Sequence, residues 1–176
     1  MRLTTIFLKR SLLWGFIFSG VIVVAAAVFW VSRGDWLYPE QINAAHLLDE
    51  NLGETTVGQS FVSSQAGLQG VEVKVDLPDN PSGSLILHLR ESPDATEDIQ
   101  QSAISLSGLP DQGGWIRFPL EPLPDSRARY YYFVIEGADD LADGRIPIHY
   151  GGPDSYADGS LYLNGQPQEG QLAFRL

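Results

Sequence analysis

The feature that most constrains this chain is an uncharged apolar run of 22 residues at positions 11–32. A helix rises about 1.5 Å per residue, so a run of this length reaches across the hydrocarbon core of a bilayer. Three basic residues precede it: Arg2, Lys9 and Arg10. Because basic flanks favour the cytoplasmic side, the sequence predicts a cytoplasmic tail at 1–10, a transmembrane helix at 11–32 and an extracytoplasmic remainder.

A cleaved signal peptide is the alternative interpretation of this run. The small residues at 25–27 resemble a cleavage site, whereas the apolar character that continues through Trp30 and Val31 favours a retained anchor. Three small residues in the run, Gly15, Ser19 and Gly20, would allow a second helix to approach closely. They are candidate docking residues within the membrane, although small residues are frequent in any membrane span.

The charge of the chain is unevenly distributed. Residues 1–33 contribute four positive charges and no negative one to a formal net charge of −11, so the remainder carries −15. This excess of negative charge argues against nucleic acid as a partner, because nucleic acid is itself a polyanion. The chain has no cysteine, so it holds no disulfide framework, thiolate nucleophile or cysteine-based metal site.

The junction at 33–56 has two interpretations. It forms either a packed linker or one short helix that begins at Pro39 and ends at Gly53, with Ile42, Ala45 and Leu48 on one side.

From residue 57 onward the pattern is that of an all-β domain. Residues 71–75 and 85–90 alternate between apolar and other side chains, as strands with one buried face do, and 130–135 is apolar throughout, as a central strand is. Shorter strands are expected at 58–62, 115–120, 146–150, 161–164 and 172–175, with turns such as Asn164-Gly165 between them. We therefore predict a jelly-roll-like antiparallel β-sandwich at 57–176, with a short helix or irregular crossover at 95–106.

A series of short motifs adds a resemblance to this pattern. They lie at 58–62, 68–73, 87–91, 115–118, 122–126, 131–133, 156–167 and 172–175. In this order they resemble the extracytoplasmic β-sandwich domain appended to polytopic, glycosyltransferase-like membrane proteins of green non-sulfur bacteria. The resemblance implies a jelly-roll relative of carbohydrate-binding modules. Since the glycosyltransferase body is absent from this chain, no catalytic role is implied.

No motif indicates an enzyme. The three histidines, His46, His88 and His149, form no metal-binding pair of the H-E-x-x-H type, and no serine lies in a G-x-S-x-G turn. We expect no cofactor. Asp139, Asp140 and Asp143 are candidate calcium ligands, but they lack EF-hand spacing, and solvated acidic turns are the alternative.

Strand alternation does indicate candidate glycan-binding residues. They are polar or aromatic residues that either lie on the side of a strand opposite its apolar face or belong to the all-apolar strand at 130–135. These residues are His88, Arg90, Trp115, Arg117, Tyr130 and Tyr132. Such side chains stack on sugar rings and hydrogen-bond to hydroxyl groups, although aromatic residues in strands also serve packing alone. The sequence thus predicts a non-enzymatic, membrane-anchored domain. Its partner is expected to be other subunits of a membrane complex or, alternatively, envelope glycans.

Overall fold

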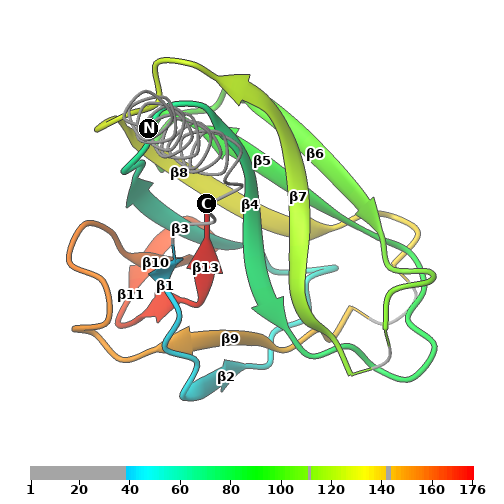
Figure 1. Ribbon diagram of the computed structural model, residues 1–176. Helices are drawn as coiled ribbons and strands as arrows, with labels where there is room; N and C mark the ends of the chain where they lie inside the picture. Colours follow the sequence, from blue (N-terminus) through cyan, green and yellow to red (C-terminus); the bar gives the residue numbers. More distant parts are fainter. Residues whose placement is uncertain (1–38, 111, 142–143) are drawn as a thin grey trace, which may run out of the picture. The chain divides into compact units, whose positions relative to one another are not determined.

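The described part of the chain is a sandwich of two antiparallel β-sheets (Figure 1). The computed structural model describes residues 39–110, 112–141 and 144–176. The seven-stranded sheet contains β1 (Pro39–Gln41), β2 (His46–Leu48), β4 (Leu68–Val75), β7 (Gly114–Leu123), β9 (Ile148–Gly151), β12 (Gln171–Leu172) and β13 (Phe174–Arg175). The six-stranded sheet contains β3 (Val57–Val62), β5 (Ser84–Arg90), β6 (Gln100–Ser105), β8 (Tyr130–Gly137), β10 (Leu161–Leu163) and β11 (Gln166–Gln168).

The two sheets lie in separate layers. β4 and β7 run side by side in front of β5 and β8 in Figure 1. In the six-stranded sheet the order is β11-β10-β3-β8-β5-β6, so β8 is central, as its apolar sequence predicts. The seven-stranded sheet is built around β4, which pairs with β7, β9 and β13.

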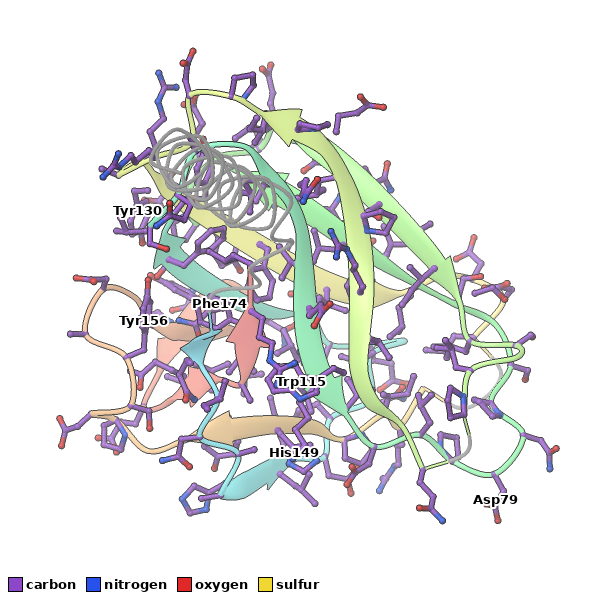
Figure 2. The ribbon with its side chains drawn as sticks, viewed as in Figure 1. Asp79, Trp115, Tyr130, His149, Tyr156 and Phe174 are labelled. Carbon is purple, nitrogen blue, oxygen red and sulfur yellow. The ribbon has the colours of Figure 1, made fainter. Side chains whose placement is uncertain are left out.

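Aromatic rings from both sheets fill the centre of the core. Phe174 of β13 contacts Phe61 of β3 and Phe133 of β8, with 5.8 Å between ring centroids in each case. Tyr156, in the loop before β10, packs edge-on against Phe174 (Figure 2). Six residues were expected in the core on grounds of parity, and the structure confirms that all are buried: Phe61, Val73, Leu87, Phe118, Phe133 and Ile135.

The segment at 95–106 differs from expectation. It contains strand β6, which pairs with β5 from Ser84↔Ser105 to Leu89↔Gln100, and no helix. The side chains of Gln100, Ser102 and Ile104 lie on the inward face of this strand. Because two of these three residues are polar, the hydrophobic period of 2 is too weak to reveal the strand.

The junction at 33–56 also differs over the residues that the structure describes. In place of a short helix it forms β1, which pairs with β13, and β2, which pairs with β9. The described part of this junction, residues 39–56, belongs to the same compact unit as the sandwich. The partner strands come from the other end of the sequence, so local pattern could not predict the pairing.

Within the described ranges no helix is long and apolar enough to cross a membrane. The predicted tail at 1–10 and span at 11–32, with Gly15, Ser19 and Gly20, lie outside these ranges.

Candidate functional site

The six candidate glycan-binding residues lie on two different outer faces. Four belong to the six-stranded sheet: His88 and Arg90 on β5, and Tyr130 and Tyr132 on β8. Trp115 and Arg117 lie on β7 of the seven-stranded sheet, with Ile116 and Phe118 as their buried neighbours. The outer faces of a sandwich point away from each other, so one small ligand cannot contact all six.

A cluster of three tyrosines lies on the outer face of the six-stranded sheet. The rings of Tyr132 and Tyr162 meet edge-on, with 5.2 Å between centroids and 74° between planes. Tyr130, which is labelled in Figure 2, lies beside Tyr162 and is 44% exposed. Gly58 of β3 makes room for this cluster, because a Cβ atom there would lie 2.2 Å from the Tyr132 hydroxyl.

Two phenols of this tyrosine cluster, those of Tyr132 and Tyr162, stay neutral at physiological pH. Burial raises the pKa of Tyr132 to about 12, against a smaller opposing effect of Arg90. Burial, with Tyr130 beside it, also raises the pKa of Tyr162. Each phenol is therefore a hydrogen-bond donor as well as an acceptor at neutral pH.

An ionic network continues from the tyrosine cluster along β5. Arg90, which pairs in register with Tyr132, donates from Nε to Oδ1 of Asp98 at 2.7 Å. Nδ1 of His88 lies 2.6 Å from Oδ2 of Asp98, and its Nε2 lies 3.3 Å from Oε1 of Glu136. Both carboxylate oxygens of Asp98 and both ring nitrogens of His88 are thus engaged.

The charge of Asp98 is stabilised by this network. Partial burial raises the pKa of Asp98, but hydrogen bonds from Arg90 and His88, with their positive charges, outweigh burial and lower the pKa below its ordinary value. Asp98 also borders a surface hollow of about 390 Å³, lined by residues of the 91–99 loop. The network gives the tyrosine cluster a fixed polar edge beside an open hollow.

The outer face of the seven-stranded sheet carries a different group of side chains. The Arg175 guanidinium lies 3.8 Å from the centroid of the Trp115 ring, and Nη1 of Arg175 lies 3.8 Å from Oε2 of Glu72. At the end of this sheet, Nε2 of His149 lies 2.9 Å from Oδ1 of Asp76. Trp115 and His149 are both labelled in the lower half of Figure 2.

The calcium candidates are not assembled into a site over the described residues. Oδ2 of Asp140 accepts a hydrogen bond from the Ser84 hydroxyl at 3.0 Å, and Asp143 lies outside the described ranges. In the part of the chain that the structure describes, no group of three or more His, Asp or Glu side chains could hold a metal ion.

Four residues that complete these two faces were absent from the sequence-based set: Asp98, Glu136, Tyr162 and Arg175. Tyr162 had a usable signal, because it lies between two apolar residues of an expected strand and faces outward. Asp98 had none, because its segment was expected to be a helix or crossover. Arg175 reaches Trp115 only across strand β4, which sequence spacing cannot show.

Comparison with known proteins places the chain in no family. No family model matches it, and no curated protein shows significant sequence similarity. Two structures of Cwp84, a surface-layer-associated cysteine protease of Clostridium difficile, resemble it in fold. One covers 79% of this chain at 10% identity with a TM-score of 0.47. The other, which includes the lectin-like domain, covers 69% at 9% identity with a TM-score of 0.44.

A third structure with some likeness is CBM28, a carbohydrate-binding module specific for non-crystalline cellulose. It covers 64% of this chain at 9% identity with a TM-score of 0.26. The chain spans 38%, 31% and 60% of the lengths of these three structures, respectively. At such identities the likeness concerns the fold alone, and the class that the strands define is an all-β, two-sheet antiparallel sandwich.

Proposed function

We propose that this protein is a non-enzymatic, extracytoplasmic binding domain that recognises a neutral glycan through the outer face of its six-stranded sheet. One observation carries the proposal: the tyrosine cluster of Tyr130, Tyr132 and Tyr162 lies directly beside the ordered polar groups of Arg90 and Asp98. Sugar recognition needs this combination, because apolar ring faces of a sugar pack on aromatic rings while hydroxyl groups need oriented donors and acceptors.

The contacts within the site favour binding over catalysis. His88 is held between two carboxylates, so in this arrangement neither ring nitrogen is free to accept a proton from a nucleophile. Within the tyrosine cluster, Tyr130 is the most exposed ring and offers contact area, while the buried Tyr132 packs against Tyr162. A preordered site of this kind loses little side-chain entropy on binding.

The proposal also includes the membrane anchor of the domain, its location outside the cell membrane and its relationship to other membrane proteins. The apolar run at 11–32 would hold the domain on the outer surface of the cell membrane, with the N-terminus in the cytoplasm. The domain would be a jelly-roll-like relative of the module appended to glycosyltransferase-like membrane proteins, here on a single span.

A second candidate function is that of an accessory subunit of a membrane protein complex. It is favoured by two apolar side chains that stand exposed near the N-terminal strands: Ile42 is 56% exposed and Leu47 is 51% exposed. Exposed apolar surface of this kind is typical of many protein–protein contacts.

The test uses the full chain purified in a mild neutral detergent. We expect retention in affinity electrophoresis through a neutral polysaccharide, and loss of retention in the Tyr130→Ala/Tyr162→Ala double variant. Trp115→Ala is the matched control, because it removes an aromatic ring from the other sheet and should leave retention unchanged. Gly58→Ala should weaken retention by displacing Tyr132, while the domain stays folded.

Three results would contradict the proposal. The tyrosine double variant could be retained as strongly as the wild type. The protein could co-migrate with a defined membrane complex from native membranes and be released by Ile42→Asp/Leu47→Asp, which would support the accessory-subunit function. Finally, the purified protein could hydrolyse a glycoside or ester and lose this activity on mutation of one carboxylate or serine.

A further inference from the structure

The outer face of the seven-stranded sheet concentrates positive charge on a strongly acidic domain. After residue 33 the sequence contains seven Lys and Arg residues, and three of them, Lys74, Arg117 and Arg175, lie on this face. Their alternate neighbours Val73, Phe118 and Phe174 are fully buried, which fixes the outward direction of all three cations. They come from the adjacent strands β4, β7 and β13.

Arg175 is held in place by an aromatic ring. Its strand β13 and the strand β7 of Trp115 flank β4 on opposite sides, so the guanidinium crosses β4 to reach the indole at 3.8 Å. Stacking of this kind orders an arginine through cation–π attraction. Glu72, at 3.8 Å, is too distant for a hydrogen bond. Among the described residues the Arg175 side chain makes no hydrogen bond, so its N–H donors remain available to a ligand.

The two other cations on this face are not neutralised by the domain itself. Within the described ranges, neither Lys74 nor Arg117 forms an ion pair. The Arg117 guanidinium lies over Gly70, where a Cβ atom would be only 3.0 Å from its Nε, so glycine leaves room for it. Among the described residues, Glu72 is thus the one carboxylate that any of these three cations contacts, and Asp76 is already paired with His149.

We propose that this face, defined by Lys74, Trp115, Arg117 and Arg175, is a second binding site that takes an acidic polysaccharide through its carboxylates. A planar guanidinium with free donors binds a carboxylate in bidentate fashion, which an ammonium group cannot do. The three cations lie across three adjacent strands, which suits a polymer that offers several charges in a row. Since the domain otherwise carries excess negative charge, a polyanion is attracted here and repelled elsewhere.

The experiment measures binding of polygalacturonate to the full chain in neutral detergent at low salt. Fully methyl-esterified polygalacturonate is the ligand control, because it keeps the backbone and removes the charge. We expect the acid form to bind more tightly than the ester, and this difference in affinity to shrink as the salt concentration rises. Arg175→Gln should weaken binding about tenfold or more, the usual effect of losing a charge-assisted hydrogen bond.

Three variants separate a built site from diffuse attraction. Arg175→Lys should weaken binding nearly as much as Arg175→Gln, because it keeps the charge but loses the planar fork. Lys74→Gln/Arg117→Gln should weaken binding about tenfold, which lies within the range for the loss of two exposed ion pairs. The matched control Arg127→Gln/Arg129→Gln removes the same charge from the exposed turn before β8 and should leave binding unchanged. Melting curves confirm that each variant is folded.

Several outcomes would overturn the proposal. If the Arg127/Arg129 and Lys74/Arg117 double variants weaken binding equally, or if Arg175→Lys binds as tightly as the wild type, the attraction is general electrostatic attraction and not a specific site. Preference for phosphatidylglycerol in mixed micelles over polygalacturonate would assign the face to anionic lipid. A change in oligomeric state in Lys74→Gln/Arg117→Gln would assign it to a second copy of the chain. Tyr130→Ala/Tyr162→Ala should leave the preference for the acid form over the ester unchanged, so this test is independent of the neutral-glycan site.

Discussion

The side chain of Gln59 accepts a hydrogen bond from the backbone N–H of Leu172 at 2.8 Å, across 113 positions of sequence. Gln59 belongs to β3 and Leu172 to β12, so this bond joins the two sheets within the core. The Gln59 amide also donates to the Ser60 carbonyl at 2.9 Å. A fully buried polar side chain is tolerated here because its hydrogen-bonding groups have partners.

We therefore expect Gln59→Leu to lower the free energy of unfolding by about 1–3 kcal/mol, because it leaves the Leu172 N–H buried without an acceptor. Chemical denaturation of the protein measures the change. Gln168→Leu is the matched control, because Gln168 is exposed on β11 and its replacement should have an effect below about 0.5 kcal/mol. Equal effects for the two variants would rule out this role for the bond.

Phe133 provides a test of core packing. The ring is fully buried and contacts Phe61 and Phe174, so Phe133→Ala should cost about 3–5 kcal/mol of stability. Ile42→Ala, at an exposed apolar position, should cost much less. A loss below about 1 kcal/mol for Phe133→Ala in denaturant titration would be inconsistent with its position in the core.

Asp98 predicts a dependence of stability on pH. Its pKa in the folded protein lies below the ordinary value of 3.8, so the folded state favours the carboxylate. The stabilisation is present above pH 3.8 and is lost as the pH falls below this value through the folded pKa. Melting temperatures of the wild type and Asp98→Asn should therefore converge on acidification below this point. A constant difference across this range would argue against the ionic network.

The proposed topology makes a prediction about intact cells. Protease added to spheroplasts should digest residues 34–176, because a basic flank favours the cytoplasmic side for the N-terminus and would leave the domain of charge −15 outside. The control is digestion after lysis of the membrane. If the domain survives until lysis, the orientation is the reverse.

Strand phase and core composition could be read from the sequence. In β4 and β5 the apolar residues alternate with others, and alternation is a local property because successive side chains of a strand point to opposite faces. The turn at Asn164-Gly165 was likewise readable, since both residues take positive φ values, +49° and +73°, that few other residues tolerate. Strands β1, β2, β6 and β11 were not predicted, because edge pairing, and not an apolar period, defines them.

The tertiary structure alone decided how the candidate residues are grouped. Alternation predicted that His88 and Trp115 both face outward, but not that they face outward from different sheets. Nor could spacing predict that Asp98 holds His88 and Arg90 together, or that Arg175 reaches Trp115 across β4. Local sequence determines which way a side chain points, whereas the neighbours it meets depend on strand order, which arises from contacts between residues far apart in the chain.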